Sequence, residues 1–283
     1  MYKAVFSDFD GTLLTSDHRI SPKTLDALQR ITKQGIPFTP ISARSPLGIW
    51  PYAKLIENYN IIVAFSGALI LDKNATPIYS VQIDSADIQA INQVLADHPA
   101  LGVNYYTYDD CVARDLNNKW VIYERSVTGI QIDPYDESAV YSPHKIQIIG
   151  ETDEVISIEQ ILKEKFPHLS ICRSHANFLE VMHKSATKGN AVRFLEDYFH
   201  VKMEECVAFG DNFNDLDMLE SVGLGVAMGN APDEIKQAAN RVTASHNDDG
   251  IALILNEIFP ESIKRRFLVI RKRLIFIFLN SAL

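Results

Sequence analysis

Hydrophobic and polar positions along the first quarter of the chain predict strands and helices that follow one another. Short apolar runs bounded by turn residues indicate buried strands, and amphipathic stretches between them indicate helices. Ser21 followed by Pro22 is typical of a helix N-cap and first turn. The predicted strands span 3–7, 37–41 and 61–65, and the predicted helices span 21–34 and 46–57. This alternation is typical of βαβ units and predicts a parallel sheet.

The same alternation returns after residue 186. We expect a helix, a strand, a helix, a strand and a helix at 188–200, 205–210, 214–221, 225–228 and 231–239. With the first strand central, the second and third strands would lie on one side of it and the later strands on the other. The strand order then reverses at Asp8, where a doubly wound sheet opens its binding crevice. The sequence therefore predicts an α/β fold with a doubly wound parallel-sheet (Rossmann-like) core.

Between these two parts the pattern changes. After a probable hairpin at 69–82, short alternating runs mix with three amphipathic stretches at 86–97, 119–126 and 153–166. We expect an antiparallel sheet that carries helices on one face, as in an inserted α+β cap domain. The predicted boundaries are 1–83 with 186–262 for the core, 84–185 for the cap, and 263–283 for an atypical C-terminal tail.

The chemistry begins at residues 5–14, V-F-S-D-F-D-G-T-L-L, where an apolar strand runs into Asp8 and Asp10. Two neighbouring carboxylates repel each other and lose hydration, so they require a cation or a shared proton. An isolated pair of this kind is more often a turn or a helix cap. Both requirements nevertheless suit phosphoryl transfer through an aspartyl-phosphate, in which Mg²⁺ bridges the charges.

Later segments supply the remaining parts of such a site. The predicted strand at 37–41 ends at a hydroxyl, backbone amides and a guanidinium, which can bind phosphate. A lysine opens the predicted helix at 188–200, and hard oxygen ligands of the type that Mg²⁺ prefers follow the strand at 205–210. These candidate residues are Ser42, Ala43, Arg44, Lys188, Asp211, Asn214 and Asp215.

In this order, the D-F-D-G-T run from Asp8, Ser42, Lys188 and the G-D-N-F-N-D run from Gly210 resemble the haloacid dehalogenase superfamily of phosphohydrolases. The long gap between Ser42 and Lys188 resembles the Cof-type subfamily, whose large α/β cap is inserted there. The set of motifs is specific, although each motif alone is weak. The resemblance covers residues 2–259.

The resemblance implies a role for each matching residue. Asp8 would be the nucleophile and Asp10 the general acid and later the base. The Mg²⁺ cofactor would be held by the carboxylates of Asp8 and Asp211 and the backbone carbonyl of Asp10, with Asp215 as a supporting carboxylate near Lys188 or a metal-bound water. Phosphate would be bound by Ser42, Lys188, Asn214 and backbone amides near Phe9 and Ala43.

Two departures from the family pattern concern the loops beside the site. Ala43 stands where the family usually has glycine, and A-F-S-G-A at 64–68 stands where an Asn-Gly pair is common. Ser66 and Gly67 remain candidates for substrate binding. Arg44 either binds substrate or pairs with a cap carboxylate. Tyr105, Tyr106 and Tyr108 either contact the organic part of a substrate or divide between core and solvent.

Composition narrows the function further. The 283 residues carry a net charge of −9, which argues against a nucleic-acid binder and leaves small phosphorylated metabolites as the expected partners. Three widely spaced cysteines, Cys111, Cys172 and Cys206, indicate buried thiols of a reducing compartment. Met1 runs directly into a strand without an apolar leader. We therefore expect a cytoplasmic protein, whose oligomeric state the sequence does not indicate.

Residues 263–283 carry six basic side chains and no acidic one. The apolar run Leu274 to Leu279 is too short for an integral membrane segment. We favour a docked or frayed extra helix over a basic amphipathic helix at a membrane surface. An altered C-terminus of the gene product is a third interpretation.

The expected function is a Mg²⁺-dependent phosphomonoester hydrolase for small metabolites, such as sugar phosphates or phosphorylated cofactors. A phosphomutase with the same intermediate and a non-catalytic regulator that binds phosphometabolites are the alternatives.

Overall fold

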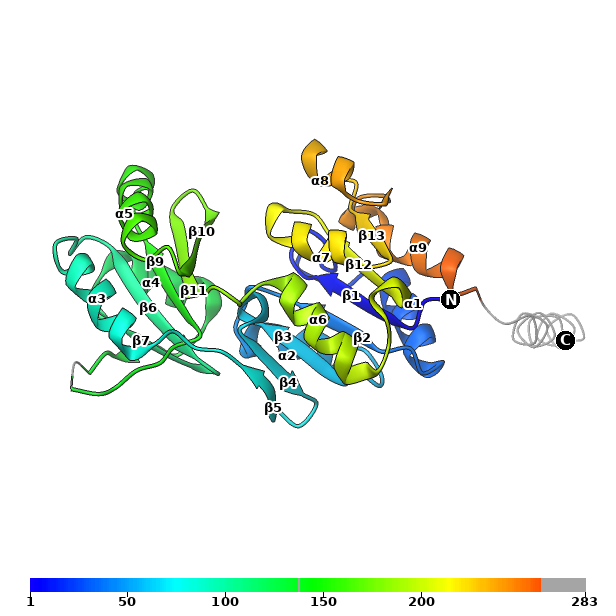
Figure 1. Ribbon diagram of the computed structural model, residues 1–283, viewed down its shortest axis with the longest axis horizontal. Coiled ribbons are helices and arrows are strands. Elements are labelled where there is room, and N and C mark those ends of the chain that lie inside the picture. Colours follow the sequence, from blue (N-terminus) through cyan, green and yellow to red (C-terminus); the bar gives the residue numbers. More distant parts are fainter. Residues whose placement is uncertain (137, 261–283) are drawn as a thin grey trace, which may run out of the picture.

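The protein is described by a computed structural model that covers residues 1–136 and 138–260. Two β-sheets lie side by side, and two chain segments connect them, after β5 and after β11 (Figure 1). The segment 263–283 discussed above lies outside the described residues. Over the part of the chain that is described, no helix is both long enough and apolar enough to span a membrane.

The first sheet has β1 near its centre, as the sequence predicts. Strands β14 to β3 run parallel, and β4 and β5 continue the sheet as an antiparallel edge. Its order is β14 (Arg241–Val242), β13 (Leu224–Ala227), β12 (Cys206–Gly210), β1 (Ala4–Asp8), β2 (Phe38–Ile41), β3 (Ile61–Ala64), β4 (Leu69–Asp72) and β5 (Pro77–Ser80). The order reverses between β1 and β12, which confirms the doubly wound α/β fold.

Helices cover both faces of this sheet, because parallel strands need cover on each side. One face packs against α1 (Pro22–Lys33), α2 (Pro46–Ala53) and α9 (Gly250–Ile258). The other packs against α6 (Lys188–Phe199), α7 (Leu216–Ser221) and α8 (Asp233–Ala238). The Ser21 side chain caps α1 by accepting a hydrogen bond from the Thr24 backbone N–H, and Pro22 occupies the first turn.

The second sheet, here called the inserted sheet, has the order β10 (Leu169–His175), β11 (Phe178–His183), β9 (Lys145–Ile149), β6 (Gly102–Thr107), β7 (Asp110–Ala113) and β8 (Asp133–Pro134). Its neighbours pair antiparallel except β7 with β8. Helices α3 (Ser85–Ala96) and α5 (Thr152–Lys165) pack on one apolar face.

The structure corrects three expectations from the sequence. Helix α4 (Lys119–Thr128) buries Val121 beside Tyr106, on the face of the inserted sheet opposite to α3 and α5, so the helices do not share one face. Cys172 is exposed, because it lies on the edge strand β10. Helix α2 ends at Ala53 instead of residue 57, and turns follow it. Helix α9 was not predicted.

Candidate active site

The predicted site residues follow the carboxyl ends of neighbouring parallel strands. Asp8 is the last residue of β1, Ser42 follows β2, and Asp211 follows β12. Because these ends meet at one edge of the sheet on both sides of the strand reversal, residues distant in sequence converge there. The topology therefore places the candidate residues around Asp8.

Lys188 is the central cation of this edge. It is the first residue of α6, whose N-cap Thr187 accepts a hydrogen bond from the Asn190 backbone N–H. The Lys188 side chain is 1% exposed, and its ammonium group donates to the carboxylates of Asp8 and Asp215. Burial alone lowers the pKa of Lys188, but the charges of Asp215 and Asp8 outweigh it and raise the pKa. Lys188 is therefore held as a cation.

Asp215 joins this ion pair to the turn after β12. It is fully buried, and its Oδ2 accepts hydrogen bonds from the backbone N–H groups of Asp211 at 2.8 Å and Asn212 at 2.9 Å. Its Oδ1 lies 2.5 Å from Lys188 Nζ. One carboxylate thus fixes both the turn that carries Asp211 and the ammonium group that contacts Asp8.

Carboxylates outnumber cations in this cluster. One carboxylate oxygen from each of Asp8, Asp211 and Asp215 lies within 4.8 Å of the others, and Lys188 contacts two of the three. Burial raises the pKa of Asp8 well above its usual range, and the charges of Asp215 and Asp211 add to this shift against the opposing charge of Lys188. Burial and the Asp215 charge also raise the pKa of Asp211. A divalent cation fits this set of oxygen donors because it would offset their repulsion.

Two residues that sequence reasoning missed hold the Asp211 carboxylate. Thr12 Oγ1 donates to Asp211 Oδ1 at 2.9 Å, and Asn230 Nδ2 lies 3.2 Å from Asp211 Oδ2 and 2.9 Å from the Gly11 carbonyl oxygen. A Cβ at Gly11, where φ is +79°, would lie 2.4 Å from Asp211 Oδ2. The available signal was positional: Asn230 closely follows β13, whose carboxyl end lies at the same sheet edge.

Asp10 has a different environment from Asp8. Its side chain is 47% exposed and binds Arg44 through two hydrogen bonds, from Nε to Oδ2 at 2.8 Å and from Nη2 to Oδ1 at 2.5 Å. Arg44 also lies over the Phe9 ring, with its Cζ 5.2 Å from the ring centroid. Among the described residues, Arg44 therefore pairs with Asp10, which follows β1, and with no carboxylate of the predicted cap at 84–185.

Two loops, 42–44 after β2 and 65–67 after β3, lie at the same sheet edge as Asp8. Ser42 is 1% exposed, and its Oγ accepts a hydrogen bond from the Arg44 backbone N–H. Ala43 does not have a positive φ, so an alanine fits where the family pattern has glycine. The second loop hydrogen-bonds to the first, since the Ser66 backbone N–H donates to the Ser42 carbonyl oxygen at 2.8 Å.

The second loop is strained. Phe65 and Ser66 have φ values of +49° and +53°, which non-glycine residues rarely adopt. Gly67 follows them with a φ of +109°. Within the part of the chain that the structure describes, the Ser66 hydroxyl makes no hydrogen bond. The exposed Asn214 side chain makes none there either, whereas the Phe9 ring is fully buried against Tyr52.

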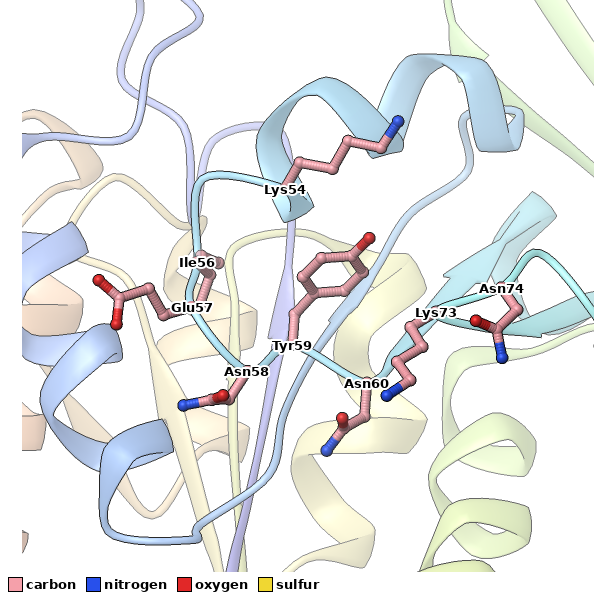
Figure 2. Close-up of a pocket in the computed structure, with 8 residues that line it drawn as sticks. All are labelled: Lys54, Ile56, Glu57, Asn58, Tyr59, Asn60, Lys73 and Asn74. Atoms are coloured by element: carbon pink, nitrogen blue, oxygen red, sulfur yellow. The ribbon is translucent and has the colours of Figure 1, made fainter.

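A hollow of about 430 Å³ lies far from the candidate site residues, at the other end of the strands. Figure 2 shows its lining residues, which belong to the segments just before β3 and just after β4. Since β3 runs parallel to β2 and β1 and antiparallel to β4, these segments lie at the ends of the strands opposite to the end that carries Asp8. It includes no candidate site residue. Its lining residues are Lys54, Ile56, Glu57, Asn58, Tyr59, Asn60, Lys73 and Asn74.

Comparison with known proteins gives consistent results. Residues 5–255 match the family of haloacid dehalogenase-like hydrolases. A Haemophilus influenzae protein named "Putative phosphatase" is 74% identical over 261 residues, which cover 92% of this chain and all of that protein. The 5-amino-6-(5-phospho-D-ribitylamino)uracil phosphatase of Bacillus subtilis is 29% identical over 89% of this chain and 96% of its own.

A solved structure is similar over nearly the whole molecule. The crystal structure of a haloacid dehalogenase-like hydrolase from Bacteroides thetaiotaomicron has a TM-score of 0.83 and 26% sequence identity, and the match covers 92% of this chain and 100% of that one. Similarity of this extent includes both sheets.

Proposed function

Because the chain belongs to the haloacid dehalogenase-like hydrolases, and is a phosphatase, we propose that it hydrolyses phosphomonoesters of small metabolites with Mg²⁺ and through an aspartyl-phosphate on Asp8. One observation carries this proposal. Asp8 is buried at a strand end, in contact with Lys188 and clustered with Asp211 and Asp215. The names of the similar phosphatases support a phosphorylated small molecule as the substrate.

In the first proposed step, an Asp8 oxygen forms a bond to phosphorus, and the bond between phosphorus and the leaving alcohol oxygen breaks. Asp10 gives its proton to that oxygen. In the second step, a water oxygen attacks the same phosphorus, Asp10 takes the water proton, and the Asp8–phosphate bond breaks to release inorganic phosphate. For this role Asp10 must leave Arg44, and its exposed position at the site mouth is compatible with such a movement.

The surrounding residues would bind the phosphoryl group. Lys188 offers its ammonium charge, and Ser42 and Asn214 offer side-chain donors, with backbone amides near Phe9 and Ala43. The Ser66 hydroxyl and the Gly67 backbone are close enough to the Ser42 loop to contribute, and Arg44 becomes available when it releases Asp10.

Asp8 and Asp211 would hold Mg²⁺ with their carboxylates, together with the Asp10 backbone carbonyl. When bound, this ion would neutralise charge on the phosphoryl oxygens. Thr12 and Asn230 orient the Asp211 carboxylate. Asp215 holds the turn after β12 and the ammonium group of Lys188 in position. Residues 84–185, which contain the inserted sheet, would act as a cap over a core of 1–83 and 186–262 and exclude water during the reaction.

The test is release of inorganic phosphate from sugar phosphates, nucleotides, pyridoxal phosphate and p-nitrophenyl phosphate, each with Mg²⁺ and with EDTA. We expect release with Mg²⁺ and none with EDTA. Interconversion of phosphate positions on one substrate without release would support the phosphomutase alternative. Tight binding without turnover would support the non-catalytic regulator.

A further inference from the structure

One face of the inserted sheet carries polar side chains that are almost completely buried. The antiparallel register places Glu180, Gln147 and Asn104 in one row across β11, β9 and β6, and Met182, Lys145 and Tyr106 in the next. The four charged or amide side chains are at most 6% exposed as residues. Buried polar groups are costly, so a whole row of them requires an explanation.

Lys145 connects this face to the Ser42 loop of the first sheet. Its Nζ donates to Glu180 Oε1 at 3.1 Å and to the Ala43 carbonyl oxygen at 3.0 Å. The same atom lies 5.7 Å from the centroid of the Phe65 ring and 5.2 Å from that of Tyr106. Lys145 thus lies beside the Ser42 loop and the strained loop at Phe65, where the alcohol part of a bound phosphomonoester must leave the phosphate site.

The hydrogen-bonding capacity of this face is not used up. Among residues 1–136 and 138–260, Asn104 Oδ1 is buried without a partner, and Glu180 accepts through Oε1 alone. An ammonium group has three N–H donors, and Lys145 directs two of them to oxygen atoms. A donor and an acceptor therefore remain next to each other, which matches neighbouring hydroxyl groups of a polyol.

The charges on this face are unbalanced toward the negative. Lys145 is already paired with Glu180, and Gln147 Nε2 donates to Oε1 of a second buried carboxylate, Glu124, at 3.2 Å. Among residues 1–136 and 138–260, this face thus carries one buried cation, Lys145, and two buried carboxylates, Glu180 and Glu124. A ligand with another phosphate would meet net negative charge in a site of low dielectric, whereas a neutral hydroxylated group would not.

We propose that Lys145 and Glu180 are the specificity-determining residues of this phosphatase, and that they bind a neutral, polyhydroxylated leaving group and discriminate against substrates with a second phosphate. Lys145 donates to a substrate hydroxyl, and Glu180 Oε2 accepts from the neighbouring hydroxyl. The inference rests on the proposed function, because it concerns the alcohol that the proposed reaction releases.

The experiment compares kcat/KM for a hexose 6-phosphate, a hexose 1,6-bisphosphate and p-nitrophenyl phosphate, which lacks hydroxyl groups. Lys145→Met should lower kcat/KM for the hexose monophosphate about tenfold or more and for p-nitrophenyl phosphate less than about threefold. Glu180→Gln should lower the preference for monophosphate over bisphosphate. Lys119→Met, which removes an exposed cap lysine paired with Glu151, is the matched control. It should change neither the ratio of kcat/KM for hexose monophosphate over p-nitrophenyl phosphate nor the ratio for monophosphate over bisphosphate.

A buried charge left without its partner can unfold the protein, so a double variant completes the set. Lys145→Met/Glu180→Leu replaces the pair with apolar side chains and should fold, keep turnover of p-nitrophenyl phosphate and lose the hexose preference. Equal losses on all three substrates, or an unchanged preference in the double variant, would overturn the inference. Failure of the wild type to release phosphate from any substrate would instead refute the proposed function.

Discussion

Replacing Gly67 with alanine tests how the strained loop positions Lys188. Gly67 has a φ of +109°, and a Cβ there would lie 2.4 Å from the backbone carbonyl oxygen of Thr187, the residue that caps α6 directly before Lys188. The obstacle is backbone, so it cannot rotate away as a side chain could. The substitution must therefore either strain the loop or move the start of α6.

The magnitude has two parts. A non-glycine residue in a left-handed conformation costs about 1–2 kcal/mol, and a collision that forces backbone to move costs about 1–3 kcal/mol more. Gly67→Ala should lower the free energy of unfolding by about 2–5 kcal/mol. Gly35→Ala is the matched control, because Gly35 also has a positive φ, +84°, but nothing lies within 4 Å of its Cβ position. It should show the conformational cost alone.

The assay is urea unfolding of both variants, with phosphate release measured on the folded proteins. Gly67→Ala should also lose turnover, because Lys188 moves relative to Asp8, while Gly35→Ala retains it. Equal destabilisation of the two variants, or full turnover by Gly67→Ala, would refute the reasoning about this contact.

Contacts of Asn230, His144 and Arg44 can each be tested by one substitution. Asn230→Ala should raise the Mg²⁺ concentration required for half-maximal turnover, since Asp211 loses one of its two side-chain donors; an unchanged requirement in a metal titration would contradict this. Burial lowers the pKa of His144 to about 4, below the value of about 6.5 in the unfolded chain, so protons bind the unfolded chain first as pH falls. As pH falls from 6.5 to 4, the free energy of unfolding of the wild type should therefore decrease more steeply than that of His144→Gln, by about 1.4 kcal/mol per pH unit. Parallel pH profiles of the two proteins would refute the lowered pKa of His144. Arg44→Met should change kcat/KM by a similar factor for all substrates if Arg44 acts on Asp10, whereas losses confined to particular substrates would indicate direct substrate binding.

The core elements could be predicted because their signals are local. The apolar run before Asp8 and the Ser21–Pro22 cap each specify one element, and the strand reversal follows from their order. Helix α9 was not predicted because it begins without a recognisable N-cap. The residue before it, Asp249, has a left-handed conformation, and its side chain makes no capping hydrogen bond. The apolar side of α9 packs against α1, a contact that the local sequence does not indicate.

The candidate site was predictable only as far as its motifs extend. Asp8, Lys188 and Asp211 belong to runs whose order and spacing identify them, and the structure brings them together. The pairing of Asp10 with Arg44 and of Lys145 with Glu180 depends on how distant strands and loops pack, because neither pair is linked by helical or hairpin spacing. A sequence pattern of period two could place Lys145 on one face of a strand but could not identify what that face contacts.

The roles proposed for the other site residues all depend on Asp8 being the nucleophile of a metal-dependent phosphatase. The first measurement to make is kcat for p-nitrophenyl phosphate with saturating Mg²⁺ in Asp8→Asn. The control is Asp17→Asn, which changes an exposed aspartate whose ion pair in the described part of the chain is with Arg19. We expect kcat to fall on the order of 10³-fold or more for Asp8→Asn with the fold retained, and not to fall for Asp17→Asn. Turnover by Asp8→Asn comparable to that of the wild type would contradict this role of Asp8.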